Sequence, residues 1–256
     1  MMARADTILI TGASGALGQA VLARLPDSVR HVILIGRDFA GVRRAANSLG
    51  ARNTKITRLQ CDLSSMDARK KLIQQLSPFQ GQVTMMVHAA GVSWPYSFSD
   101  FSSRLLEEFL QINALAFADL AHWAIKQMDR DIGGHIVAVS STATLHPGQE
   151  HMLIAASKAC LEQLVRCYAA AHVRKKITVN AVLPGAMASA GGDAYRKELA
   201  RILDTSVATI LEERYKHLAT DDLISPLEVA DAIVGFLSQP GFARTGNLLR
   251  VSGGKF

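Results

Sequence analysis

The chain has 256 residues, enough for one large domain with a sizeable buried core, and its composition of 49% hydrophobic and 20% charged residues is that of an ordinary globular protein. No run approaches the roughly 18 uncharged apolar residues of a membrane span, and the first residues lead almost directly into a strand, so we expect neither a membrane segment nor a signal peptide. The net charge of +6 comes from scattered basic residues without interleaved aromatic side chains, which indicates a basic surface and argues against nucleic-acid binding.

Short runs of β-branched residues alternate along the chain with longer helical patterns. The short runs predict strands at 7–11, 31–36, 55–60, 83–88, 134–140, 177–183 and 247–254. The longer patterns predict helices at 15–25, 39–49, 101–128, 152–172 and 225–237, and a further helix that begins after the segment DLSS, where serine supplies an N-cap.

Strands that are apolar on both faces and alternate with helices are typical of a parallel sheet covered on both sides. We therefore predict an α/β fold with a doubly wound, seven-stranded parallel sheet, in one domain that spans residues 1–256. The three cysteines, Cys61, Cys160 and Cys167, are odd in number and lack metal-type spacing, so we expect a reduced cytoplasmic setting and no metal site.

The segment TGASGALG, residues 11–18, joins the first predicted strand to the first predicted helix. Gly12, Gly15 and Gly18 allow a tight turn, a close approach of the backbone to a ligand, and close packing of helix on strand. The start of the helix then offers free N–H groups and a positive dipole end to a pyrophosphate. We expect a bound dinucleotide here; a glycine-rich turn without a ligand is the alternative.

The second predicted strand ends in the segment LIGRD. Gly36 stands where an NAD site usually has a carboxylate, and Arg37 follows it. Because an arginine can bind a 2′-phosphate through charge-assisted hydrogen bonds, the pattern favours NADP(H) over NAD(H). The alternatives are that Asp38 serves an NAD site and that Arg37 is only a solvated loop residue.

Several motifs occur in an order that resembles the short-chain dehydrogenase/reductase family, in particular the 3-oxoacyl-carrier-protein reductases. They are the glycine turn at 11–18, CDLS at 61–64, HAAG at 88–91, LQINAL at 110–115, IVAVSS at 136–141, ASKA at 156–159, VNAVLPG at 179–185 and VSGG at 251–254. The resemblance covers nearly all of the chain. It implies a single-domain Rossmann fold and a ketoreductase-like oxidoreductase that acts on a small, carrier-bound or polyketide-like substrate.

The resemblance also implies roles for single residues. Ser141 would bind the substrate carbonyl oxygen, Lys158 the nicotinamide ribose, and Asn113 a water near that lysine. Asp62 would contact the adenine. The full set that would bind the cofactor is Gly12, Ser14, Gly15, Ala16, Leu17, Gly18, Arg37, Asp62, Leu63, Ala89, Ala90, Gly91, Lys158, Pro184 and Gly185. As alternatives, Asn113 could be a polar helix breaker, Ser141 a turn residue and Lys158 a surface lysine.

The resemblance further implies a substrate lid and an oligomer. The lid would span residues 186–222, with Gly191 and Gly192 as a candidate hinge. Candidate substrate contacts in the lid are Met187, Tyr195 and Leu203. Arg196 and Lys197 are candidates to contact an acidic group of the substrate. A homodimer or homotetramer would pack through the predicted helices at 101–128 and 152–172. Their apolar residues could equally well pack on the chain's own sheet; these residues are Phe117, Leu120, Trp123, Leu161, Leu164 and Val165.

The chain departs from the family pattern four residues before Lys158, where a tyrosine usually donates the proton. Ile154 stands there and has no proton to give. His88 and Ser189 also replace residues that are often asparagine and threonine. Loss of a general acid typically costs ~10²–10⁴-fold in rate, while hydride positioning and oxyanion stabilisation can remain.

Four interpretations of Ile154 stay open at this point. Water or the substrate could handle the proton, which we favour, or another residue could replace the tyrosine. His151 shares a helix face with Ile154, and His146 and Tyr96 are looser candidates. The chain could instead bind nucleotide without chemistry, as a regulator or a silent subunit, or it could catalyse a non-redox reaction.

Overall fold

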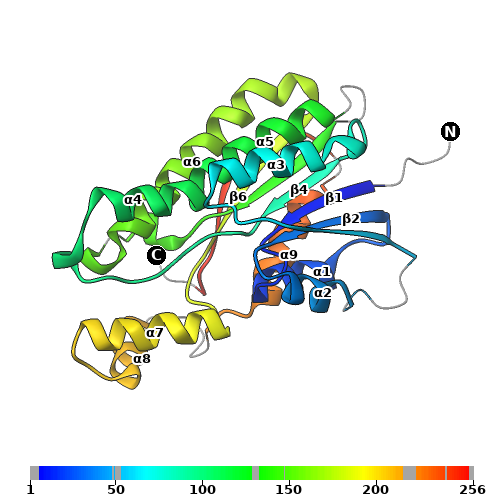
Figure 1. The fold of residues 1–256 in the computed structure, drawn as a ribbon. Helices are drawn as coiled ribbons and strands as arrows, with labels where there is room; N and C mark the ends of the chain where they lie inside the picture. Colours follow the sequence, from blue (N-terminus) through cyan, green and yellow to red (C-terminus); the bar gives the residue numbers. More distant parts are fainter. Residues whose placement is uncertain are drawn as a thin grey trace.

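One parallel sheet runs through the centre of the computed structural model, which describes residues 6–47, 49, 53–128, 133–146, 148–215, 223–239 and 241–253 (Figure 1). Its seven strands lie in the order β3-β2-β1-β4-β5-β6-β7. Their bounds are β1 Asp6–Thr11, β2 Val29–Gly36, β3 Lys55–Gln60, β4 Met85–His88, β5 Gly134–Val139, β6 Ile177–Pro184 and β7 Leu248–Val251. The predicted seven-stranded, doubly wound sheet is confirmed.

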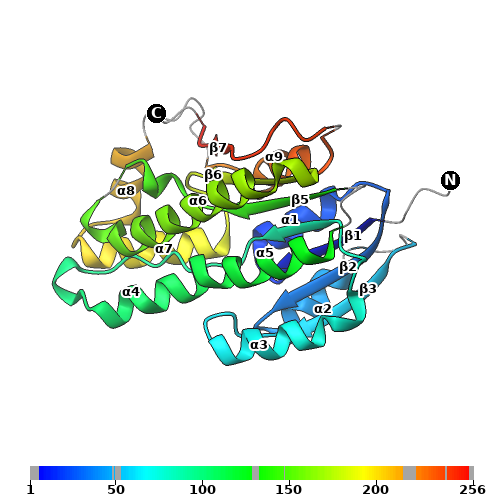
Figure 2. The same cartoon turned by 90° about the horizontal axis from the view of Figure 1, so that it is seen from above.

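Helices cover both faces of this sheet (Figures 1 and 2). On one face lie α1 (Ala16–Arg24), α2 (Phe39–Asn47) and α9 (Pro226–Leu237). On the other lie α3 (Met66–Gln75), α5 (Ala116–Gln127) and α6 (Met152–His172). Each face buries its own apolar core, which explains why the central strands are apolar on both sides.

The order of the strands reverses between β1 and β4. Both strands neighbour each other in the sheet, and Thr11 pairs with His88 at their carboxyl ends. In an open parallel sheet, a ligand binds in the crevice outside the strand ends at such a switch point. The predicted glycine turn begins at this pair, so the fold brings it to that crevice.

The prediction of one continuous helix at 101–128 is wrong, because this region is divided into three helical segments. An α-helix, α4, spans Ser103–Leu110, a π-helical turn spans Gln111–Leu115, and α5 follows. The apolar pattern continues through all three, so periodicity does not show the break. The π turn accommodates an extra residue and lets Asn113 point into the protein, where it is fully buried.

Three predicted strands are shorter in the structure, and of these β5 ends one residue early, at Val139. Pairing of β4 with β1 begins at Met85, and pairing of β7 with β6 ends at Val251. The predicted strand end at 254 lies outside the described residues. The predicted lid contains α7 (Ala190–Ile202) and α8 (Val207–Tyr215), which extend away from the sheet in Figure 1; residues 216–222 lie outside the described part.

Most of the apolar residues that were open to two interpretations belong to this chain's own core. Phe117, Leu120, Trp123, Leu161 and Val165 are buried, and Leu164 packs partly against the same cluster. They therefore carry no argument for a second subunit. Among the described residues, no helix is both long and apolar enough to cross a lipid bilayer.

Candidate active site

The glycine turn is shaped by close backbone packing. Gly12 has a φ of +70°, a conformation that suits glycine, and a Cβ there would lie 2.7 Å from the backbone of Ala89 and Ala90. A Cβ on Gly18 would overlap the backbone oxygen of Gly12 and lie 2.7 Å from the Cα of Ala13. The protein's own packing therefore requires the first and third glycines.

Gly15 is different, because the protein itself leaves room for a side chain there. A Cβ would meet only the backbone oxygen of Gly12, at an ordinary 3.4 Å, and Gly15 is exposed. It is the N-cap of α1, has no side chain to cap the helix, and no acidic residue stands in the first turn. Free N–H groups and an uncompensated helix dipole remain, which suits an anion that approaches closely from outside.

The carboxyl end of β2 presents a basic side chain. Arg37 is exposed, whereas the carboxylate of Asp38 is held beside Gly41 and pairs with Arg44 at 3.4 Å. A Cβ on Gly36 would lie 2.7 Å from the side chain of Val42, so helix α2 leaves no room for the usual carboxylate. The geometry therefore leaves Arg37 open to a ligand.

Asp62 follows β3 at the same edge of the sheet. It accepts hydrogen bonds from the hydroxyl of Ser64 at 2.7 Å and from the backbone N–H of Ser64 at 3.1 Å. The hydroxyl bond is the main reason that the pKa of the Asp62 carboxyl is lowered, and Arg37 adds to it. The neighbouring Leu63, like Leu17 in α1, has its side chain in a hydrophobic core, so only its backbone is free to face a cofactor.

Lys158 lies inside the protein, not on its surface. It is 5% exposed, and its ammonium group donates to the carbonyl oxygen of Val139 at 2.8 Å. Burial lowers the pKa of this lysine from 10.5 to about 8, against the opposing effect of Glu162. Glu162, which the sequence analysis missed, accepts from Ser140 at 2.6 Å and from Thr144 at 2.8 Å.

The side chains of Asn113 and Lys158 both lie close to Gly91. A Cβ on Gly91 would lie 2.8 Å from Oδ1 of Asn113 and 3.0 Å from Nζ of Lys158. The Asn113 amide accepts from the N–H of Val92 and donates to the carbonyl of Val92 and the hydroxyl of Ser157, each at 2.9 Å. Its side chain thus fixes the loop after β4 to helix α6, and the water assigned to it stays a prediction.

The ends of β5 and β6 complete this edge of the sheet. Ser141 follows β5, is half-buried, and its hydroxyl accepts from the N–H of Ala143 at 3.1 Å. Thr142 joins this turn to β6 by donating to the carbonyl of Pro184 at 3.3 Å. A Cβ on Gly185 would lie 3.0 Å from Ile224, so a glycine is favoured there by the chain itself.

His88 takes a structural place inside the sheet. It is fully buried, its Nδ1 lies 3.0 Å from the hydroxyl of Thr11, and its ring meets the edge of Phe117. Burial, with the nearby Lys158, lowers the pKa of His88 to about 3. The imidazole is therefore neutral at physiological pH and is not a general acid.

Ile154 is 2% exposed and belongs to a separate apolar cluster with Tyr96, Phe109 and Leu153. Tyr195 of α7 packs against the same cluster. His146, by contrast, is exposed. The Ile154 position is thus part of a packed apolar cluster that residues of α6 and Tyr195 of α7 share.

One residue of the predicted lid has a role that differs from the prediction. Arg196 is buried and donates to Asp193 at 2.6 Å, so it is not free for an acidic substrate group, whereas Lys197 is exposed. Ser189 caps α7 by accepting from the N–H of Gly192 at 3.1 Å. A Cβ on Gly192 would lie 2.5 Å from the carbonyl oxygen of Met187. The close packing at the start of α7 therefore requires a glycine at this position.

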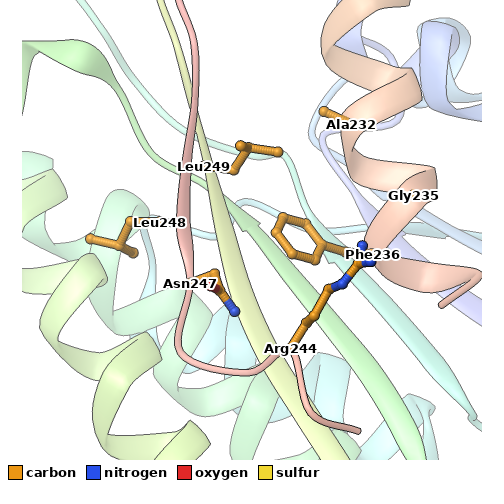
Figure 3. Close-up of a pocket in the computed structure, with 7 residues that line it drawn as sticks. All are labelled: Ala232, Gly235, Phe236, Arg244, Asn247, Leu248 and Leu249. Atoms are coloured by element: carbon orange, nitrogen blue, oxygen red, sulfur yellow. The ribbon is translucent and has the colours of Figure 1, made fainter. Parts of the chain in front are cut away.

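A hollow of about 390 Å³ lies elsewhere, between α9 and β7 (Figure 3). It is lined by Ala232, Gly235, Phe236, Arg244, Asn247, Leu248 and Leu249. None of these is a predicted site residue, so this hollow is separate from the site at the strand ends.

Comparison with known proteins agrees with this geometry. Residues 6–200 match the short chain dehydrogenase family. The uncharacterized oxidoreductase YuxG of Bacillus subtilis is 28% identical over 96% of this chain, which spans only 37% of that relative's length. Acetoacetyl-CoA reductase of an Acinetobacter species is 23% identical over 100% of this chain and 99% of its own.

A solved structure shows the same fold. A single-residue variant of actinorhodin polyketide ketoreductase with NADPH superposes with a TM-score of 0.87 at 22% identity, covering 99% of this chain and 98% of that one. Because the family match extends over well more than half of the sequence, this chain belongs to the short chain dehydrogenase family.

Proposed function

We propose that the protein is an NADP(H)-dependent, ketoreductase-like oxidoreductase that transfers hydride to the carbonyl of a small, carrier-bound or polyketide-like substrate without the usual tyrosine. The observation that carries the proposal is the buried Lys158, which meets Asn113 beneath Gly91 at the same strand ends as the glycine turn. A cationic group is costly to bury, so its place in a ligand crevice favours a functional role. The reductases among the relatives support the same chemistry.

The residues at the strand ends fit a dinucleotide. The turn at 12–18 would hold the pyrophosphate, Arg37 the 2′-phosphate, and Asp62 with the backbone of Leu63 the adenine. Ala89, Ala90 and Gly91 would line the groove, Lys158 would hold the nicotinamide ribose, and Pro184 and Gly185 would shape the nicotinamide pocket. When bound, the reduced nicotinamide supplies the hydride.

The protein's own groups would then stabilise the developing oxyanion. The hydroxyl of Ser141 can turn to donate to the carbonyl oxygen. Lys158, with a pKa of about 8, is mostly protonated at neutral pH and provides a positive charge in a dry setting. Ile154 contributes no proton, and the apolar surface around it excludes water.

We extend the proposal to one domain over residues 1–256 with a lid at 186–222, and to a homodimer or homotetramer. Calorimetric titration with NADPH and NADH, followed by NADPH oxidation with ketones, acyl thioesters and quinones, tests the central claim. We expect tighter binding of NADPH and a turnover that falls in Ser141→Ala. Binding without turnover would reject the proposal in favour of a catalytically silent nucleotide-binding homologue, and no binding would reject both.

A further inference from the structure

Three titratable side chains are linked where the lid meets helix α6. The hydroxyl of Tyr195, in α7, lies 2.5 Å from Nε2 of His151. On the other side of the ring, a carboxylate oxygen of Glu150 lies 3.6 Å from Nδ1. The side chains of His151 and Glu150 are 19% and 12% exposed and the Nδ1 atom is itself buried, so solvent reaches this pair only in part.

This link borders the position that lacks the tyrosine. His151 immediately precedes α6 and stands three residues before Ile154, or about 4.5 Å along a helix axis. Tyr195 packs against the cluster that contains Ile154, and Ala143, two residues after Ser141, packs against the same cluster. Tyr195 and the turn that follows Ser141 therefore border the same apolar cluster, and we infer that a substrate carbonyl bound by Ser141 would sit beside it.

We propose that Tyr195 donates the proton to the substrate oxygen and that His151, whose protonated form the Glu150 carboxylate favours, resupplies it. This inference rests on the proposed function. As the carbonyl carbon gains the hydride from the reduced nicotinamide, the C=O π electrons move to oxygen. The O–H bond of Tyr195 breaks and the product O–H bond forms, the phenolate takes the proton from Nε2 of His151, and the imidazole regains a proton from water.

The charges around the link suit this direction of transfer. A protonated imidazole beside Tyr195 favours its phenolate and so makes the tyrosine a stronger acid, and the Glu150 carboxylate favours the protonated imidazole. Two other charged groups on that turn of α7, Asp193 and Arg196, are bound to each other at 2.6 Å. Their opposite charges largely compensate each other beside the link.

Tyr96 provides a matched comparison within the same cluster. It is 9% exposed, and among the described residues its hydroxyl has no hydrogen-bond partner. Burial raises the pKa of this tyrosine, which makes it a weaker acid, and the described part of the chain links no base to it that could return a proton. Its place is that of a packing residue.

Conservative substitutions separate the two tyrosines. We expect Tyr195→Phe to lower kcat by ~10²–10⁴-fold with NADPH affinity unchanged, and Tyr96→Phe to change kcat by less than about threefold. In the Ile154→Tyr background, which restores the family's acid, Tyr195→Phe should cost less than about tenfold. If Tyr195 had only a structural role, Tyr195→Phe would lower kcat by the same factor with and without Ile154→Tyr.

A second readout needs no turnover. NMR titration of the His151 imidazole in the protein without cofactor should show a lower pKa in Glu150→Gln, because the nearby negative charge is lost, and a changed pKa in Tyr195→Phe. If the pKa of the His151 imidazole is the same in the unaltered protein, in Glu150→Gln and in Tyr195→Phe, the proposed link is refuted. Turnover that survives Tyr195→Phe, or is lost instead in Tyr96→Phe, would reject the relay alone, whereas NADPH binding without any turnover would reject the proposed function itself.

Discussion

The burial of Lys158 predicts a pH-dependent stability difference between the protein and its Lys158→Met variant. Its pKa falls from 10.5 in the unfolded chain to about 8 in the folded protein. Between these values the unfolded chain binds more protons, so the stability of the unaltered protein rises with pH across that window. Below the window, the charged lysine costs the folded state about 3 kcal/mol, at about 1.4 kcal/mol for each pKa unit.

Methionine keeps a side chain of similar length but has no such titration. Its lost hydrogen bond to Val139 alters the absolute stability by a similar amount at each pH, and the attraction of Glu162 for the charged lysine is already contained in the pKa of about 8. We therefore expect the unaltered protein to gain about 2.5 kcal/mol of unfolding free energy relative to the variant between about pH 7 and about pH 10. Chemical denaturation of both proteins measures this gap. A gap that stays constant with pH would refute the buried, charged state of Lys158.

Three further predictions concern the glycine turn, the cofactor and the apolar cluster around Ile154. Gly18→Ala is expected to lower the free energy of unfolding by about 1–3 kcal/mol, because its methyl group overlaps backbone atoms. Gly15→Ala, with only an ordinary contact, should mainly weaken NADPH binding, and denaturation with calorimetry of the pair distinguishes the two effects. Arg37→Ala should weaken NADPH binding by roughly tenfold or more and leave NADH unchanged; equal affinities for both cofactors in the unaltered protein would contradict this. Ile154→Ala should cost about 2–5 kcal/mol in a denaturation experiment because the side chain is 2% exposed, and a loss below about 1 kcal/mol would show a loosely packed cluster.

The sequence predicts the fold well because each element carries its own periodicity. Central strands are apolar on both faces, and the helices between them have one buried face, so the sheet and its two helical layers follow from local patterns. The π turn at 111–115 is the exception, since an extra residue in a helix barely alters the apolar pattern. Strand ends also differ, because partner strands and not propensity decide where β4 and β7 pair.

The site is predictable where chemistry depends on residues near in the chain. The roles of Gly12 and Gly18 follow from one turn, and the structure gives each a backbone reason. The link between His151 and Tyr195 joins residues 44 positions apart, and it depends on where the tertiary fold places α7 relative to the start of α6. Arg196 is buried where it donates to Asp193 and to the carbonyl of Met187, and local sequence does not show that burial, which is why the sequence alone suggested a free cation there.

The position of the proposed acid has a consequence for how this site would work. In the family pattern the tyrosine stands on the same helix as the lysine, so acid and cofactor site are fixed together. Here Ile154 fills that place, and Tyr195 belongs to α7, which extends from the sheet beside the strand ends (Figure 1). Proton donation would therefore depend on the lid being closed against α6, whereas cofactor binding by the turn at 12–18 and Lys158 would not. A substitution that loosens the start of α7, such as Ser189→Ala, which removes its N-cap, should lower kcat while it leaves NADPH affinity unchanged. A parallel loss of NADPH affinity would show that the lid also holds the cofactor.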